Sequence, residues 1–87
     1  MGAREHLLLA GLTHFVSAPS AEAGQAEIER LTATAFDPAQ FAAAVAGLLR
    51  DGLIREPIRL EPQALQCHWR LELTPDGVAL ARTLTGA

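Results

Sequence analysis

The chain has 87 residues, a length typical of one small domain, and 49% of them are hydrophobic, enough for a packed core. Its formal net charge of −3 argues against a protein that depends on nonspecific attraction to phosphate. No apolar run approaches the roughly 18 residues of a membrane span, and no basic leader precedes a hydrophobic stretch. Cys67 is the only cysteine, which excludes an intramolecular disulfide and fits a reducing compartment. We therefore expect a cytoplasmic protein without membrane contact.

The first helix is predicted over Arg4–Val16. At about 100° per residue, one side of it carries Leu8, Leu9, Leu12, Phe15 and Val16. Leu7 lies off that side, and a helix with two apolar sides packs on two neighbours. In so small a domain the second neighbour is predicted to be another subunit of a homodimer. The predicted dimer interface consists of Leu7, Ala10, Gly11, His14, Leu80 and Leu84.

A short second helix is predicted over residues 25–33. The preceding residues 17–24 contain a proline and a glycine among small side chains, which is typical of a loop. Ile28, Leu31 and Ala35 lie on one side of this helix and are expected to face the core.

The third helix is predicted to start after Asp37, a residue type that favours the N-cap position. Pro38 suits the first helical position, and Gln40 completes a spacing like that of a capping box. Gly52 predicts its C-terminal end. Phe41 and Leu48 belong to its core-facing side.

After Gly52 the apolar residues alternate, in 53–61 and again in 65–73, which predicts a two-stranded hairpin with residues 61–64 as its turn. The predicted cross-strand pairs are Leu60 with Leu65, Ile58 with Cys67, and Ile54 with Leu71. Trp69 would join their inner face, and Cys67 is interpreted as a small core residue. The outer face would carry Arg55, Pro57, Arg59, Gln66, His68 and Arg70.

The last helix is predicted to begin with Thr74 as its N-cap and Pro75 at its first position. Leu80 and Leu84 would pack on the rest of the protein. No internal repeat or long linker divides the chain, so residues 1–87 are expected to form one domain.

Three stretches of the sequence resemble the winged helix-turn-helix domains of MarR-like and PadR-like bacterial regulators. "AVAGLLRDGLIRE" resembles a recognition helix running into the wing, and "LELTPDGVALAR" resembles the second wing strand passing into a closing helix. "AEIERLTATAFDPAQF" occupies the place of the helix and turn before recognition. The resemblance covers roughly residues 5–83. It implies a mostly helical α+β fold, with three helices, a two-stranded β wing and a C-terminal helix.

The same resemblance implies that the third helix enters the major groove of duplex DNA. Gln40 would approach adenine, and the methyl groups of Ala39 and Ala43 would touch thymine. Arg50, at the far end, is better placed for a phosphate. This side of the helix is otherwise small and neutral, so a second hypothesis is that its alanines dock a protein partner.

The predicted wing offers stronger electrostatics. In the predicted register Arg55 stands opposite Arg70, with Arg59 and His68 nearby. Like charges placed across strands are unfavourable unless something neutralises them, and a phosphate backbone would do so. Alternatively, the neutralising groups are glutamates of the chain itself, namely Glu56, Glu61 and Glu72.

Catalysis, metal binding and cofactor binding are not expected. Cys67 and His68 are neighbours in a strand and point to opposite faces. His6 and His14 would lie about 12 Å apart along their helix, too far to chelate together. The leading hypothesis is therefore a dimeric, non-enzymatic regulator that binds duplex DNA. The alternative is a winged-helix module that binds a protein partner and no DNA.

Overall fold

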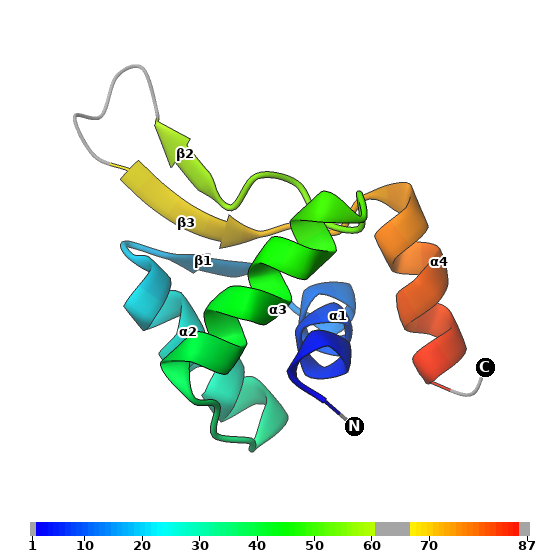
Figure 1. Cartoon of the computed structure of the whole chain (residues 1–87), viewed down its shortest axis with the longest axis horizontal. Coiled ribbons are helices and arrows are strands. Elements are labelled where there is room, and N and C mark those ends of the chain that lie inside the picture. The colour runs from blue at the N-terminus through cyan, green and yellow to red at the C-terminus, as the bar shows by residue number, and fades with distance from the viewer. Residues whose placement is uncertain (1, 61–66, 86–87) are drawn as a thin grey trace.

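The computed structural model describes residues 2–60 and 67–85, with the backbone alone for residues 59, 60 and 67. The elements in chain order are α1 (Ala3–Thr13), β1 (Val16–Ala18), α2 (Ala21–Thr32), α3 (Pro38–Arg50), β2 (Ile58–Leu60), β3 (Cys67–Leu71) and α4 (Pro75–Leu84) (Figure 1). Most residues in these elements are helical, and the strands are antiparallel. The predicted α+β class with a mostly helical chain is confirmed.

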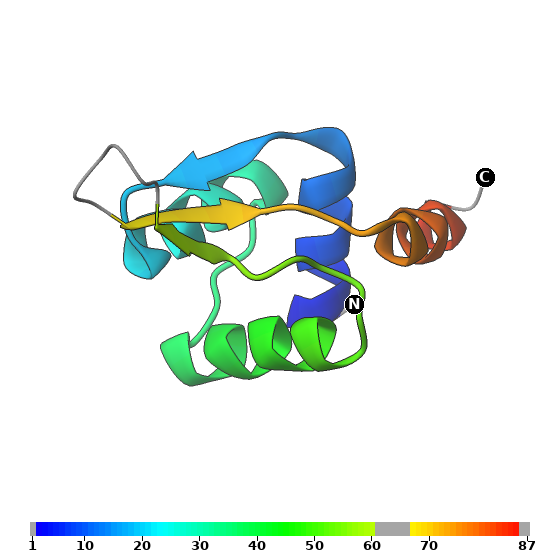
Figure 2. The ribbon, with the colours of Figure 1, turned by 90° about the horizontal axis from the view of Figure 1, so that it is seen from above.

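The three strands form one sheet in the order β1-β3-β2, and they lie side by side in Figure 2. The prediction contained only β2 and β3, because β1 falls on the last residue of the predicted first helix and the first two residues of the predicted loop. That helix ends at Thr13 rather than Val16. Val16 points inward from β1 and is 1% exposed, whereas Phe15 is 74% exposed. Neighbours in an extended chain point to opposite sides, so the prediction that Phe15 shares one apolar side with Val16 was wrong.

α2 begins at Ala21, inside the stretch predicted as a loop. Ser20 is its N-cap, and the Ala23 amide donates a hydrogen bond of 3.1 Å to the Ser20 hydroxyl. This cap starts the helix earlier than its apolar pattern indicates. The helix ends at Thr32, so Ala35 lies beyond it and is exposed rather than facing the core.

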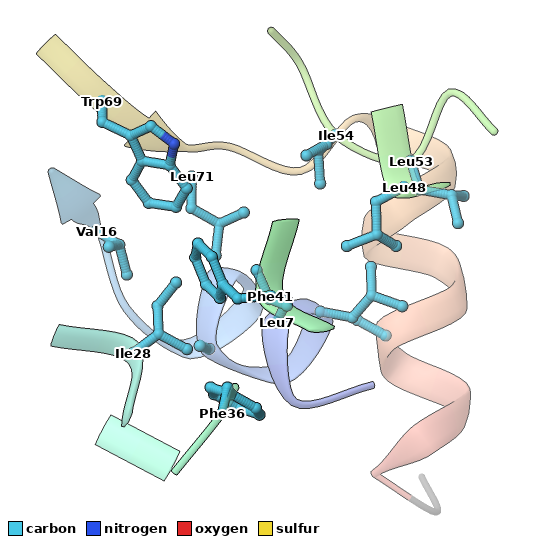
Figure 3. Close-up of a cluster of buried hydrophobic side chains, with 13 residues drawn as sticks. Leu7, Val16, Ile28, Phe36, Phe41, Leu48, Leu53, Ile54, Trp69 and Leu71 are labelled. Atoms are coloured by element: carbon cyan, nitrogen blue, oxygen red, sulfur yellow. The ribbon is translucent and has the colours of Figure 1, made fainter. Parts of the chain in front are cut away.

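Trp69 of β3 packs directly on α2 at Gly24. A Cβ atom at position 24 would lie 2.3 Å from Cε3 of the indole, so any side chain there would collide with the ring. The Trp69 side chain is 4% exposed, as predicted for the inner face of the hairpin. Its ring centroid lies 5.9 Å from that of Phe41, which lies 6.3 Å from Phe36. These rings form the aromatic part of the core (Figure 3).

Both ends of α3 lie where the sequence predicted them. Pro38 occupies the first position after Asp37, although the Asp37 side chain makes no capping hydrogen bond. Gly52 follows the helix with a φ of 72°, a conformation that favours glycine. The Leu53 amide donates a hydrogen bond of 2.9 Å to the Leu48 carbonyl, which gives the helix end a Schellman geometry. The chain therefore turns sharply from α3 toward the hairpin.

The hairpin register differs by two residues from the predicted one. Ile58 pairs with Trp69 and Leu60 with Cys67, and an isolated bridge joins Ile54 to Leu73. A shift of two residues keeps each side chain on its face, which is why Trp69 still points inward. Pro57, however, is buried instead of lying on the outer face. The predicted positions of Leu65 and Gln66, and of the Cys67 side chain, lie outside the described residues.

The second apolar side of α1 is covered within the chain. α1 packs against α2, α3 and α4 (Figure 1). Leu7 is fully buried, and Ala10 is 3% exposed. Leu73, from the segment before α4, lies against Gly11. The prediction of Leu7 and Ala10 as dimer contacts was therefore wrong, because these side chains have almost no surface to offer a second subunit. His14 is exposed.

α4 begins as predicted. The Thr74 hydroxyl accepts a hydrogen bond of 3.1 Å from the Gly77 amide, which caps the helix. Leu84 packs against the core, whereas Leu80 is 37% exposed and contributes less than predicted. The buried residues of this helix are Gly77 and Ala81, whose small size allows α4 to lie close to its neighbours.

Candidate interaction surface

The exposed side of α3 carries the residues predicted to approach DNA bases. Ala39, Gln40 and Ala43 in the first half of the helix are all exposed, as is Arg50 at its end. The Arg50 side chain has 77% of its surface accessible. This side of the helix therefore presents methyl groups over most of its length, with one amide and one guanidinium.

Asp51 organises the charges at the C-terminal end of α3. Its carboxylate lies 2.7 Å from Nη2 of Arg4 in α1 and 3.7 Å from Nε of Arg50. The hydrogen bond from Arg4 lowers the pKa of the Asp51 carboxyl below its ordinary value of 3.8, and Arg50 adds to this effect. A phosphate at Arg50 would therefore compete with a carboxylate already in place.

Arg55 stands opposite Glu72, not opposite Arg70. The Arg55 amide donates a hydrogen bond of 2.9 Å to the Glu72 carbonyl, and Nε of Arg55 lies 3.8 Å from Oε2 of Glu72. The predicted pair of like charges was wrong, because the register is shifted by two residues. The alternative prediction was that glutamates of the chain itself neutralise these arginines. It is confirmed for Glu72, while Glu61 lies outside the described residues. Arg55 therefore needs no phosphate to neutralise it, because Glu72 already does so.

The other predicted phosphate contacts do not form an exposed row with Arg55. Arg70 lies in the central strand β3, where its register partner is Ser17 of β1, and it is only half-exposed. His68 is half-exposed as well and pairs with Arg59. The Arg59 side chain lies outside the described residues.

A groove of about 310 Å³ lies between α3 and the hairpin, and we call it the α3–hairpin groove. Its α3 side consists of Phe41, Ala42, Val45, Ala46 and Leu49. The opposite side consists of Glu56, Pro57, Ile58 and Trp69, with Ala21 from the start of α2. All of these side chains except that of Glu56 are apolar, so the groove is suited to apolar rather than to phosphate ligands.

Ile58 forms the outer rim of this groove. It pairs directly with the buried Trp69, yet 58% of its own surface is exposed. The prediction of Ile58 as an inner-face residue was right about its side of the hairpin and wrong about its burial. No described element lies over it. Ala42 and Ala46, across the groove on α3, are exposed as well.

The sequence patterns did not bring these residues together, because helix and hairpin were considered separately. Ala39 and Ala43 were the alanines predicted to touch DNA, and Ile58 was predicted on the inner face of the hairpin. The groove could have been predicted from two features together. Ala42 and Ala46 flank the core-facing side of α3, and the hairpin carries the bulky Ile58 on its inner face.

Two other hollows have more polar linings. One of about 470 Å³ lies where α1 begins and is lined in part by Gly2, His6 and Gln40. Another of about 350 Å³ lies between α1 and α2 and includes His6, Thr13 and His14. Neither combines an aromatic floor with an exposed large apolar rim, as the α3–hairpin groove does.

Within residues 2–60 and 67–85, no group of three histidine, cysteine or acidic side chains is placed to hold a metal ion. No helix in this part of the chain is long and apolar enough to cross a bilayer. Comparisons of the chain with protein-family models, curated proteins and solved structures found no match.

Proposed function

We propose that the chain is a winged helix-turn-helix domain, with α3 in the recognition position and the β2–β3 hairpin as its wing. The order of helices and strands supports this proposal. The sharp turn at Gly52, which sends the chain from α3 into the hairpin, supports it as well. β1 would be a third strand, paired with β3 of the wing on the side away from β2.

We also propose that this domain binds a segment of another protein through the α3–hairpin groove. The observation that carries this proposal is the composition of the groove, in which apolar side chains from α3 and the hairpin face one another beneath the exposed Ile58. Exposed apolar surface gathered in a concave site marks interaction surfaces on soluble proteins.

Duplex DNA is the second candidate partner. The exposed Gln40 and Arg50 on α3 favour it. The charges do not, because Arg55 lies beside Glu72 and Arg50 beside Asp51, so each phosphate contact would replace an internal one. Proteins that hold DNA depend on several cations free to displace counterions from phosphate. We therefore rank a protein segment above DNA.

Selection from a library of random displayed peptides of about 16 residues tests the proposed function. The immobilised wild-type chain is expected to enrich peptides whose binding is lost with Ala46→Glu, which places a charge in the groove. Ala43→Glu is the matched control, because Ala43 is an exposed alanine of the same helix outside the groove. Peptides that bind both variants equally would show that the groove is not the site.

A salt series with duplex DNA completes the test. We expect no measurable binding at about 50 mM salt. Binding that falls steeply with salt, and that weakens in Arg50→Ala, would instead establish the DNA hypothesis and overturn the ranking given above.

A further inference from the structure

We propose that the occupant of the α3–hairpin groove is an amphipathic helix of a partner protein, with a lysine or arginine beside its apolar stripe. This inference rests on the proposed function and adds the shape and charge of the partner. Three features of the groove lead to it, namely its length along α3, its small residues and its one acidic side chain.

The groove follows α3 for about two turns. Phe41, Val45 and Leu49 are spaced four residues apart, so they span about 12 Å along the helix axis. A docked helix that uses anchors at i, i+3 or i+4, and i+7 covers a similar length. The groove therefore matches a short helical segment better than a single small molecule.

The small side chains on α3 allow a close approach. Ala42 and Ala46 lie one turn apart, are exposed, and carry nothing beyond Cβ. When two helices meet through small side chains, their axes lie about 8 Å apart, at the short end of the usual range of about 8–10 Å. Ile58, on the other side of the groove, would then be covered by apolar side chains of the docked helix.

Glu56 gives the groove a preferred charge. It is the only ionisable residue of the lining, it is exposed, and it forms no ion pair with another described side chain. The chain as a whole carries a net charge of −3, which also attracts a cationic segment. A lysine or arginine would lay its apolar stem along the groove and place its charged end at Glu56.

Titration with defined synthetic peptides, followed by tryptophan fluorescence, tests this proposal. Trp69 is the only tryptophan and lines the groove, so its emission reports directly on occupancy. The first probe is a helical peptide of about 16 residues with leucines at i, i+3, i+4 and i+7 and lysines beside that stripe. The second carries glutamates in place of the lysines. The third has the same composition with its leucines spread around the helix.

We expect the lysine peptide to bind wild type about three- to tenfold more tightly than the glutamate peptide, as for a partly exposed ion pair. Glu56→Gln should remove most of this difference and leave the leucine dependence unchanged. Ala46→Glu should abolish binding, whereas Ala43→Glu should bind like wild type. Far-ultraviolet circular dichroism verifies that each variant is folded.

Equal binding of the lysine and glutamate peptides, or of the third peptide, would overturn the proposal. If displayed peptides depend on the groove but lack a helical stripe, the proposed function stands and this inference fails. If no displayed or synthetic peptide binds, both fail. Self-association in sedimentation experiments that Ala46→Glu abolishes would identify the occupant as a second copy of this chain and would overturn the inference as well.

Discussion

α1 and α3 each have more apolar surface than one neighbouring element can cover. The two helices differ in whether that surface is covered within the chain. On α1 both apolar sides are covered within the chain, because α2, α3 and α4 all pack against this helix and leave Leu7, Leu8 and Ala10 buried. On α3 the side with Phe41 and Leu48 is covered, while Ala42 and Ala46 remain exposed beside the hairpin. An apolar side of a helix predicts that something covers it, but the topology decides whether the cover is internal.

This difference changes the interpretation of oligomeric state. The homodimer was predicted from Leu7, which is fully buried within the chain. The surface left open lies instead on α3 and the hairpin, which the prediction had assigned mainly to DNA. The following predictions test the contrast between the two helices, from the largest expected effect to the smallest.

Leu7→Ala tests the covered side of α1. Removing a fully buried leucine should lower the free energy of unfolding by about 2–5 kcal/mol, through lost burial and the cavity left behind. Urea denaturation followed by circular dichroism measures this loss. Leu80→Ala, at a residue 37% exposed on α4, is the control and should cost far less. Similar small losses for both variants would contradict the burial of Leu7 within the chain.

Gly52→Ala tests how α3 ends beside its open side. Because the φ of 72° is unfavourable for a residue with a Cβ, the variant should lose about 1–2 kcal/mol of stability. Apart from its two chain neighbours, no described residue has an atom within 4 Å of the added methyl group, so strain in the backbone is the main expected cause. Urea midpoints give the value. An unchanged midpoint would show that the turn is not held in this conformation.

The Arg4–Asp51 ion pair, which links α1 to α3, should make a small pH-dependent contribution. The folded-state pKa of Asp51 is lowered by its hydrogen bond with Arg4, so the contribution is complete above about pH 4 to 5 and is lost as the pH falls through the lowered value. Arg4→Gln should remove most of this dependence, because Arg4 is the main cause of the lowered pKa of Asp51. Both side chains are partly exposed, so the effect should be smaller than that of Gly52→Ala and should decrease with salt. Equal pH profiles for wild type and variant would contradict it.

Ile58→Ser should leave stability almost unchanged, within about 0.5 kcal/mol, because more than half of the side chain is already exposed. Peptide binding in the groove should nevertheless weaken. The two measurements together separate an interaction residue from a core residue. A loss comparable with that of Leu7→Ala would place Ile58 in the core after all.

The parts of the fold that depend on local chemistry were predictable. Thr74 and Gly52 act through hydrogen bonds and backbone conformations within a few residues, and both helix ends lie where these residues indicated. The α1 boundary failed because Phe15 and Val16 continue a helical pattern in sequence. They separate only when Val16 pairs with Leu71 in the sheet, which is a contact between distant parts of the chain.

The candidate site was predictable only in pieces. The alanines of α3 and the alternation of the hairpin were visible, but the two-residue register shift decides that Arg55 meets Glu72 and that Ile58 meets Trp69. Alternation fixes the face of a side chain and leaves its partner open, because shifts by two residues preserve the pattern. The charge and the shape of the surface both depend on that choice.

The packing of α4 on α1 also has a consequence for how the protein is made. α4 follows α1 in the chain with the three strands, α2 and α3 between them, so a ribosome releases α1 long before α4 exists. Until α4 is synthesised, the part of α1 on which α4 packs is exposed. A nascent chain with exposed apolar surface is prone to association with other chains. Closing the contact between α1 and α4 is a nonlocal step, because the two helices are far apart in the sequence.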